Sequence, residues 1–429
     1  MKRISIAILG YGVVGSGVYS IISGNHNDLC HKDNLDFIVD KILVRSIAHS
    51  SQKKNAPVSL FTESIDDILN DDDISIVVEC IGGIEPARTY IIEALKKGKT
   101  VVTSNKEVIS KHWSEFESVA KKTGAGLYME ATVAGGIPIL RTINDSMQAN
   151  NISSVMGIIN GTTNYILTKM SEEGLEFADV LKEAQELGYA EADPTADIEA
   201  FDATYKLSIL SSMAFHAHMP VDVIYREGIQ NLTKTDFENA QKLGYTIKLL
   251  AIGKKKDNRI EVRVHPTMIP RNHPLASVRG VYNAIFLTGH AVGDIMLYGR
   301  GAGCLPTASA VVSDVVYAAL ADGHHRYMTF ENTKDLSSGV ELVKDFSCIY
   351  CIRLNVVDEP GTMTAVAGCF ANHKVSLKEV LQLNNDPDTD TQITFLTHEA
   401  HEFSIREALD DIMKLPCVLK LDSLIRAES

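Results

Sequence analysis

The sequence predicts an α/β protein with a doubly wound parallel sheet, an α+β middle domain and a small C-terminal α+β module. Three observations lead to this class. A glycine motif stands between a strand-like run and a helix-like run near the N-terminus. Strand-like and helical stretches alternate through the first third of the chain. The final part reads as strand, helix, strand, strand, helix, strand. At about 150 residues per domain, the 429 residues allow two to three domains.

The composition excludes several classes of protein. The chain carries 41 Lys and Arg against 55 Asp and Glu, a net charge of −14, which argues against nucleic acid or an anionic membrane as the main partner. No apolar run reaches the roughly 18 residues of a membrane span, and the N-terminal stretch lacks a signal-cleavage site. The seven scattered cysteines predict no disulfide framework and fit a reducing cytoplasm. Cys348 and Cys351 form a lone C-x-x-C pair in a strand-like run, which favours structural thiols over a zinc or redox site.

The glycine motif is the first functional feature of the chain. Residues 3–9 form a short apolar run, and the next six residues fit G-x-G-x-x-G directly before a helix-like stretch. Glycines at this place permit a tight turn and let a pyrophosphate approach the backbone at the helix N-terminus. The motif therefore predicts a Rossmann-like, dinucleotide-binding domain. The cofactor contacts predicted here are Gly10, Gly12, Val13, Val14 and Gly15.

Further strands and helices continue the pattern. Strands that alternate with helices predict a parallel sheet, whose carboxyl ends form the ligand crevice. The predicted strands are 37–44, 74–80, 100–103 and 126–129, and the predicted helices between and after them are 86–97 and 108–122.

The end of the second strand usually selects between NAD and NADP. An acidic residue there binds the ribose 2′-hydroxyl of NAD, whereas an arginine accommodates the 2′-phosphate of NADP. This strand ends at Arg45, while Asp40 lies too early for the acidic role, and Lys53 and Lys54 follow. The pattern favours NADP(H) over NAD(H). The alternative is that these residues are solvated loop charges.

Two later segments add candidates at the same edge of the sheet. The fourth strand ends in the residues TSNK, so Lys106 is a candidate for the reacting region and Ser104 for a cofactor contact. A bare lysine at a strand end is, however, more often a surface residue. A second glycine-rich loop, around Gly303, precedes an apolar helix at 308–321. This loop either returns to the cofactor or forms an ordinary turn.

The segment 186–210 combines charged and apolar residues in a way that suggests catalysis. A helix ends near Gly188, and the next helix is expected to carry Glu199, Asp202 and Lys206 on one face. Its flanking residues are largely apolar, which indicates burial. A buried ammonium group needs a partner and can serve as a proton donor. The alternative is a surface ion pair between Asp202 and Lys206, which contributes roughly 0.2–0.5 kcal/mol.

Seven motifs together resemble the monofunctional homoserine dehydrogenases. They occur in order and span most of residues 1–320, and the segment from Glu191 to Lys206 is the most family-specific. One departure is Ala196, which stands where the family often has the first of two acidic residues, so that Asp197 alone remains. The change concerns substrate placement and not the class of reaction. The motifs are GYGVVG, GGIEPA, TSNK, EATVAGGIPIL, GIINGTTNYIL, ELGYAEADPTADIEAFDATYK and GRGAGCLPTASAVVSD.

The resemblance implies the reaction and its site. The family interconverts L-aspartate 4-semialdehyde and L-homoserine with NAD(P)(H), on the route to threonine, methionine and isoleucine. Lys206 is implied as the general acid/base, with Lys106 as a second lysine at the reaction centre and Asp202 orienting Lys206 or the substrate. Substrate contacts are implied at Glu191, Asp202, Gly161 and Thr162. A monovalent cation, Na⁺, is implied at Glu130 and the carbonyl oxygens of Val133, Gly135 and Ile137.

The last segment resembles an ACT domain, a small ferredoxin-like βαββαβ regulatory module. Its most typical piece is the DEPG turn at 358–361, before the first helix. ACT domains pair through their sheets and bind amino acids near this turn, so effector contacts are implied at Asn355, Asp358 and Gly361. Threonine is the natural feedback ligand. The alternative is a module that only supports oligomerisation.

The expected organisation is a homodimer or homotetramer that acts on a small molecule. The predicted domains are a nucleotide-binding domain at 1–129 and a substrate-binding and dimerisation domain at 130–326, whose chain returns to the nucleotide domain near 300–326. A linker is predicted at 327–346 and a regulatory domain at 347–429.

Two other functions stay open on the sequence alone. One is a dehydrogenase of another small semialdehyde, and the other is a nucleotide- and amino-acid-binding sensor without turnover. The retention of Lys106, Asp202 and Lys206 argues against the sensor, because a sensor has no need for a proton donor.

Overall fold

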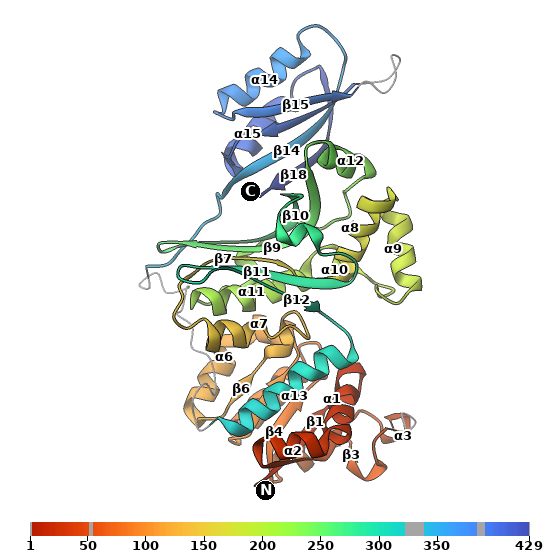
Figure 1. Ribbon diagram of the computed structural model, residues 1–429, viewed down its shortest axis with the longest axis vertical. Helices are drawn as coiled ribbons and strands as arrows, with labels where there is room; N and C mark the ends of the chain where they lie inside the picture. Colours follow the sequence, from red (N-terminus) through yellow and green to blue (C-terminus); the bar gives the residue numbers. More distant parts are fainter. Residues whose placement is uncertain (1, 51–54, 322–338, 384–390, 429) are drawn as a thin grey trace. The chain divides into compact units, whose positions relative to one another are not determined.

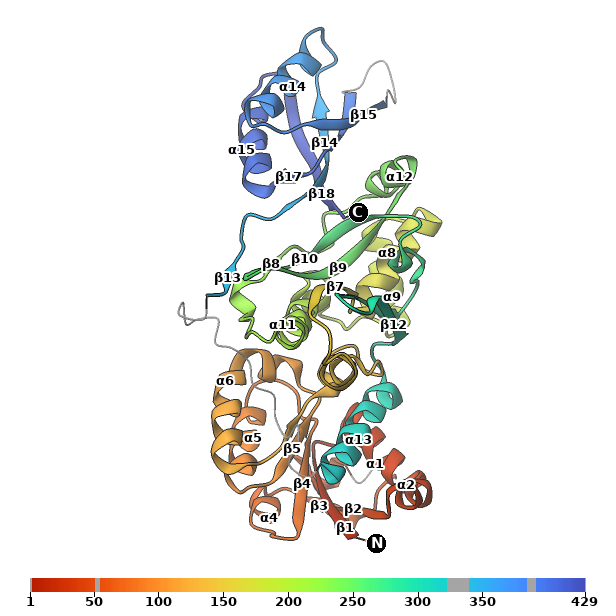
Figure 2. The same ribbon diagram turned by 60° about the vertical axis from the view of Figure 1, so that its left-hand side comes forward.

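The computed structural model describes residues 2–50, 55–321, 339–383 and 391–428 (Figures 1 and 2). The chain divides into two compact units, each assembled from three separate stretches. Among the described residues, no helix is long and apolar enough to cross a membrane. The first unit comprises Met1–Val155, Asp202–Ile224 and Tyr282–Gly339, and the second comprises Met156–Phe201, Tyr225–Val281 and Val340–Ser429.

The first unit contains a parallel six-stranded sheet with the order β3-β2-β1-β4-β5-β6. This is the doubly wound order, so the predicted fold class is confirmed. The register places Leu9 opposite both Leu43 and Glu79, and Glu79 opposite Thr103. The loops after these four strands therefore leave the sheet at one edge. The strands are β1 (Lys2–Leu9), β2 (Leu35–Leu43), β3 (Phe61–Thr62), β4 (Ile74–Glu79), β5 (Thr100–Thr103) and β6 (Leu127–Tyr128).

Helices cover this sheet because their apolar faces need burial. Helices α1 and α13 lie side by side (Figures 1 and 2) and share a core with β1 and β2 that includes Ile8, Val18, Phe37 and Val311. The helices of this unit are α1 (Val13–Gly24), α2 (His26–Asp33), α3 (Ile47–Ser50), α4 (Asp66–Leu69), α5 (Ala87–Lys96), α6 (Lys106–Thr123), α7 (Ile139–Arg141), α11 (Phe201–Phe215, from Asp202 onward) and α13 (Cys304–Leu320). An antiparallel pair is formed by β11 (Tyr282–Gly289) and β12 (Gly293–Arg300), and β7 (Ile152–Ile158) crosses to the second unit.

The second unit is built on a mixed sheet that contains the order β9-β10-β18-β14-β16-β15. Within it, β18-β14-β16-β15 with α14 and α15 has the topology of a ferredoxin-like βαββαβ module, as the sequence pattern predicts. Both helices cover the same face of these strands (Figures 1 and 2). The strands are β8 (Tyr225–Arg226), β9 (Tyr245–Lys256), β10 (Arg259–Pro270), β13 (Glu341–Leu342), β14 (Ser347–Val356), β15 (Leu377–Leu383), β16 (Thr391–Thr397), β17 (Ala400–His401) and β18 (Val418–Ala427). The helices are α8 (Gly161–Glu173), α9 (Phe177–Glu186), α10 (Thr195–Ile198), α12 (Lys234–Lys242), α14 (Thr362–Asn372) and α15 (Glu402–Ile412).

One expected helix is interrupted. The prediction that Glu199 belongs to the helix of Asp202 and Lys206 is wrong, because α10 and α11 are separate helices. Ala200 lies between them with a φ of 64°, a left-handed conformation through which an α-helix does not continue. The carbonyl oxygen of Glu199 accepts a hydrogen bond from Arg226 Nη1 at 2.9 Å instead of from the next turn of a helix.

A buried ion network fastens β18 within the second unit. Arg426 is fully buried, and its guanidinium donates to Glu402 at 2.6 and 2.9 Å and to Glu227 at 2.7 Å. It also donates to Tyr225 Oη at 2.7 Å. Because Tyr225 and Glu227 come from the middle of the chain, the network ties the C-terminal module to the rest of this unit. Buried charges require partners of this kind.

Replacing Arg426 should therefore destabilise the protein strongly. We expect Arg426→Ala to lower the free energy of unfolding by about 3–5 kcal/mol, because it leaves buried carboxylates without their main cation. Arg406 bonds the same Glu402 but its side chain is 48% exposed, so Arg406→Ala should cost less than about 1 kcal/mol. Urea denaturation followed by circular dichroism measures both, and equal losses would contradict the role assigned to Arg426.

Candidate active site

The loop after β1 has the geometry that the glycine motif predicts. Gly10 has a φ of 96°, and a Cβ on Gly15 would lie 2.0 Å from the carbonyl oxygen of Gly10, so the fold itself requires both glycines. Gly12 differs, because no described atom lies within 4 Å of a Cβ built on it. The open space before the N-terminus of α1, where Val13 and Val14 offer backbone N–H groups, fits a pyrophosphate that approaches the backbone.

The loop before α13 closes on the same glycine turn. The thiol of Cys304, the first residue of α13, donates to the carbonyl oxygen of Val13 at 2.9 Å. Gly17 permits this approach, since a Cβ there would lie 2.8 Å from the sulfur atom of Cys304. Gly303 precedes the helix with a φ of 119° and is exposed. The start of α13 therefore lies against the turn and the first helix that follow β1.

Two buried polar residues that the sequence did not single out organise the ends of β4 and β5. The carboxylate of Glu79 accepts hydrogen bonds from Thr103 Oγ1 at 2.6 Å and from the N–H of Ile81 at 2.7 Å. Burial raises the pKa of Glu79, although these hydrogen bonds oppose the shift. The side chain of Asn105 caps α6 and donates to the carbonyl oxygen of Gly83 at 2.7 Å. These bonds fix the first turn of α6.

Lys106 on α6 and Lys206 on α11 both contact one carboxylate, that of Asp202. Lys106 Nζ lies 3.1 Å from Asp202 Oδ1, and Lys206 Nζ lies 2.5 Å from Asp202 Oδ2. Asp202 and Lys206 are 9% and 10% exposed, whereas Lys106 is 40% exposed. The structure thus brings together the three residues predicted as catalytic, with Ser104 two residues before Lys106. Two ammonium groups around one carboxylate leave one positive charge, which suits a developing oxyanion.

The side chains predicted to select the cofactor follow β2. Arg45 is exposed directly after the carboxyl end of this strand. Asp40 lies inside the strand and its carboxylate accepts from Arg3 at 2.8 Å, so it is engaged elsewhere. Lys53 and Lys54 lie outside the described residues. An exposed guanidinium at this edge is suited to a 2′-phosphate.

A second group of charges surrounds Glu130, which begins the short helix η2 (Glu130–Thr132). Its carboxylate accepts from the N–H groups of Leu140 at 2.9 Å and Arg141 at 2.7 Å, and its own N–H donates to Asp314 at 2.8 Å. The side chain of Arg141 pairs with Asp314. Burial, and next the charge of Asp314, raise the pKa of Glu130 to about 7, and burial raises the pKa of Asp314 to about 6.

The turn after Glu130 carries the carbonyl groups predicted to bind a cation. Val133 and Ile137 are buried, and Gly135 has a φ of 50°. A Cβ on Gly135 would lie 2.4 Å from the carbonyl oxygen of Gly301, so this turn packs against the loop before α13. The candidate donors are one carboxylate and three carbonyl oxygens. Such an all-oxygen set fits a hard cation such as Na⁺.

Three of the residues predicted to bind the substrate, Glu191, Gly161 and Thr162, belong to the second unit, whereas Asp202 belongs to the first. Gly161 and Thr162 begin α8, which Asn160 caps with its side chain. Asn160 Nδ2 also donates to Asp197 Oδ1 at 2.6 Å, an anchor that the sequence reasoning missed although Asn directly before a helix is a typical cap. Thr162 Oγ1 donates at 2.7 Å to a carbonyl oxygen of the α9–α10 loop, which also carries the exposed Glu191.

The predicted effector residues lie at one end of the C-terminal module. Asp358 and Gly361 are exposed in the turn before α14, and Gly361 has a φ of 104°. Asn355 Oδ1 on β14 is buried without a hydrogen-bond donor among the described residues, which favours a donor supplied by a ligand or by water. Burial raises the pKa of Cys348 and of Cys351 to about 12, consistent with structural thiols.

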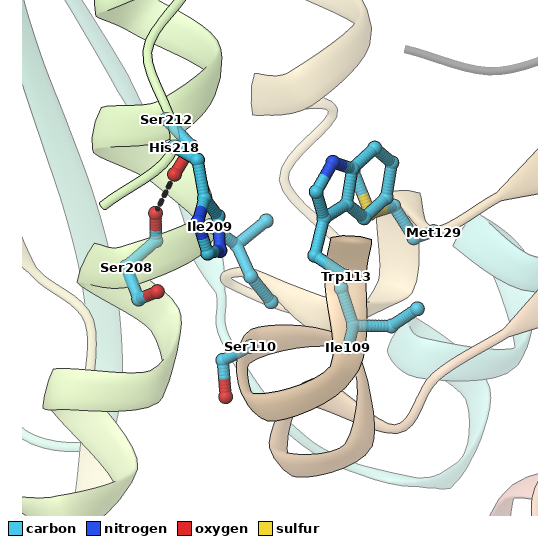
Figure 3. Close-up of a pocket in the computed structure, with 8 residues that line it drawn as sticks. All are labelled: Ile109, Ser110, Trp113, Met129, Ser208, Ile209, Ser212 and His218. Carbon is cyan, nitrogen blue, oxygen red and sulfur yellow. Dashed lines mark hydrogen bonds between the residues drawn. The ribbon is translucent and has the colours of Figure 1, made fainter. Parts of the chain in front are cut away.

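A small pocket lies between α6 and α11 (Figure 3). Its serine hydroxyls bond within the protein, as where Ser212 Oγ donates to the carbonyl oxygen of Ser208 at 2.6 Å. Its lining residues include no carboxylate and no lysine, so it is distinct in chemistry from the Lys106–Asp202–Lys206 cluster. The lining residues are Ile109, Ser110, Trp113, Met129, Ser208, Ile209, Ser212 and His218.

Comparisons with known proteins find relatives along the whole chain. A family model for homoserine dehydrogenase matches residues 138–316, and one for the NAD binding domain of homoserine dehydrogenase matches residues 10–130. The homoserine dehydrogenase of Bacillus subtilis (strain 168) is 38% identical over 435 residues, covering 100% of this chain and 99% of the relative. A solved homoserine dehydrogenase from Thiobacillus denitrificans is 39% identical, with a TM-score of 0.92, over 100% of this chain and 99% of that chain. A hyperthermophilic archaeal homoserine dehydrogenase in complex with NADPH is 29% identical, with a TM-score of 0.64, over 74% of this chain and 98% of that chain.

The raised pKa of Glu130 predicts a pH-dependent stability. The pKa of Glu130 is about 7 in the folded protein and 4.5 in the ordinary case. Between pH 4.5 and about pH 7, the folded protein therefore binds the proton of Glu130 more tightly than the unfolded chain does. The stability of the wild type relative to Glu130→Gln should therefore fall as pH rises through this window, by no more than about 3 kcal/mol, and stay level above it.

Thermal unfolding in sodium-free buffer between about pH 5 and 8 measures this difference. Glu93→Gln is the matched control, because Glu93 is an exposed partner of Lys96. The difference in stability between Glu93→Gln and the wild type should not change with pH over this range. A wild-type advantage over Glu130→Gln that grows with pH would contradict the assignment.

Proposed function

The chain belongs to the homoserine dehydrogenase family, and on this basis we propose that the Lys106–Asp202–Lys206 cluster performs the proton transfer of its reaction. Homoserine dehydrogenase is an NAD(P)-dependent oxidoreductase of amino-acid biosynthesis that interconverts L-aspartate 4-semialdehyde and L-homoserine. The observation that carries the proposal is the pairing of one buried carboxylate with two ammonium groups.

In the direction of reduction, the bound nicotinamide supplies a hydride to the aldehyde carbon, and the aldehyde oxygen becomes an alkoxide. Lys206 donates the proton, so that its N–H bond breaks as the O–H bond of homoserine forms. Asp202 stays ionised, stabilises the ammonium form of Lys206 and holds its side chain in place. Lys106 offers a second positive charge to the same oxygen. In the reverse direction, neutral Lys206 accepts the proton of the hydroxyl group.

The cofactor is proposed to be NADP(H), with NAD(H) as the weaker ligand. The exposed Arg45, the engagement of Asp40 with Arg3, and the NADPH complex of the archaeal relative support this preference. The proposed cofactor contacts are Gly10, Gly12, Val13, Val14, Gly15, Arg45, Ser104, Lys106 and Gly303. The proposed substrate contacts are Glu191, Asp202, Gly161 and Thr162.

A cation and an effector complete the proposal. Na⁺ is proposed at Glu130 and the carbonyl oxygens of Val133, Gly135 and Ile137, and the buried carboxyl of Glu130 beside Asp314 supports it, because a cation offsets the repulsion between the two. Threonine is proposed to bind at Asn355, Asp358 and Gly361 of an ACT-type module, supported by the βαββαβ topology and the unpaired amide oxygen of Asn355. The proposed assembly is a homodimer or homotetramer.

The proton transfer is tested by Lys206→Ala. We expect kcat for the reduction of aspartate semialdehyde to fall about 10²–10⁴-fold, because the alkoxide loses its proton donor. NADPH binding, measured by the fluorescence of the reduced nicotinamide, should change little. Lys121→Ala is the matched control, because Lys121 is an exposed lysine in the last turn of α6 that pairs with Glu117. Undiminished turnover in Lys206→Ala would overturn the assignment.

The cofactor preference is tested by Arg45→Ala. Losing a charge-assisted hydrogen bond to the 2′-phosphate should raise the KM for NADPH about 10–100-fold and leave the KM for NADH nearly unchanged. Arg259→Ala serves as control, since Arg259 is an exposed arginine on β10 of the second unit. Equal changes for both cofactors would show that Arg45 does not read the 2′-phosphate.

A further inference from the structure

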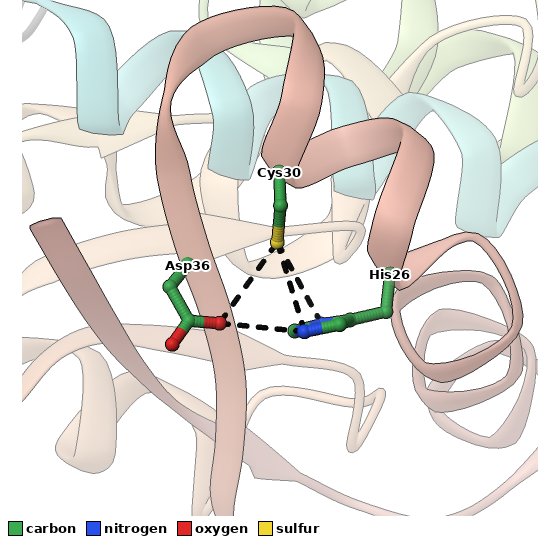
Figure 4. Close-up of side chains that lie close together, drawn as sticks. All are labelled: His26, Cys30 and Asp36. Carbon is green, nitrogen blue, oxygen red and sulfur yellow. Dashed lines mark hydrogen bonds and ion pairs between the residues drawn. The ribbon is translucent and has the colours of Figure 1, made fainter. Parts of the chain in front are cut away.

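Three potential metal ligands converge in the first unit, far along the sheet from the glycine loop. His26 and Cys30 are one turn apart on α2, and Asp36 is the second residue of β2. Figure 4 shows the imidazole, the thiol and the carboxylate lying close together. Asp36 stands at the amino end of β2, whereas Arg45 follows its carboxyl end, so the cluster is separate from the dehydrogenase site.

The distances within the cluster are close to those of a metal site, although the imidazole of His26 does not yet face the sulfur atom. His26 Nε2 lies 3.4 Å from Asp36 Oδ1 and 3.7 Å from Cys30 Sγ, and Cys30 Sγ lies 3.9 Å from Asp36 Oδ1. Tetrahedral zinc, with bonds of about 2.3 Å to sulfur and 2.0–2.2 Å to nitrogen and oxygen, requires ligand separations of roughly 3.3–3.6 Å. The separations are within a few tenths of an ångström of these values, but Cys30 Sγ lies nearly equally far from His26 Nδ1 (3.8 Å) and Nε2 (3.7 Å), so the partly exposed His26 ring must also rotate to aim Nε2 at the ion.

The ligand types select the class of ion. A thiolate and an imidazole favour zinc-class transition ions over Mg²⁺ and Ca²⁺, which prefer oxygen ligands alone. Cys30 is buried, while the side chains of His26 and Asp36 are 43% and 33% exposed. The ion therefore has a route from solvent, and water can take the fourth position.

We propose that His26, Cys30 and Asp36 bind one zinc-class divalent ion that fastens α2 to β2. Helix α2 has the polar sequence HNDLCHKD. Of the side chains described in this helix, Cys30 alone is buried, so few apolar contacts hold the helix in place. Binding converts the thiol to a thiolate, forms a sulfur–metal bond and releases the proton to solvent, with no change of oxidation state. The role is structural, and it does not rest on the dehydrogenase reaction.

The test uses untagged, full-length protein that has been stripped with a chelator and titrated with Co²⁺. We expect one equivalent to bind with the near-ultraviolet charge-transfer band of a cobalt–thiolate bond, and Zn²⁺ to abolish the band by displacement. Cys30→Ser should lose the band. His26→Gln, at a side chain exposed enough to spare the fold, should weaken Co²⁺ binding at least about tenfold.

His31→Gln is the matched control, because His31 is an exposed histidine on the same helix outside the cluster; it should bind Co²⁺ like the wild type. Hydrogen exchange gives a second readout, in which saturating Zn²⁺ should slow exchange in α2 of the wild type and not of His26→Gln. The proposal is overturned by a thiolate band that persists in Cys30→Ser, by an equal loss in His31→Gln, or by unchanged exchange in α2 at saturating Zn²⁺. Dehydrogenase activity is independent of each of these outcomes.

Discussion

The proposed reaction centre depends on the single carboxylate of Asp202. Burying the ammonium group of Lys206 costs several kcal/mol unless an opposite charge lies beside it, and Asp202 supplies that charge at 2.5 Å. The same carboxylate contacts Lys106, so it holds two like charges close together and fixes how α6 faces α11. Without it, the two ammonium groups would repel each other at the place proposed for the proton transfer.

Strand register supplies the second constraint. The last residues of β1, β2, β4 and β5 lie opposite one another, so the glycine turn, Arg45 and the start of α6 all emerge at one edge. Gly10 and Gly15 are required by the chain's own packing, whereas Gly12 is open to the outside. This difference separates the glycines that build the turn from the one that leaves room for a ligand. Helix α13 packs against α1 behind this turn, where the thiol of Cys304 donates to the carbonyl oxygen of Val13.

The sequence predicted the parallel sheet and its main helices because apolar periodicity and glycine position are local properties. It did not predict the break at Ala200, since that break depends on contacts with residues that come later in the chain. Nor did it single out Glu79 or Asp314, because a buried carboxylate becomes recognisable only through its partners in space. The predicted roles of Glu191 and the cation site came from family resemblance, since nothing in their spacing alone defines a ligand.

The pairing of β18 with β10 has a consequence for the order in which the molecule is made. The sheet of the second unit joins Thr267 on β10 to Arg426 on β18, and the ion network closes only when Arg426 is present. The first unit can assemble its six-stranded sheet once β6 has left the ribosome, and it completes its core with α13. The second unit completes its sheet only with β18: before then β10 can pair with β9 and β8, while Thr267 and Met268 still lack their partners on β18.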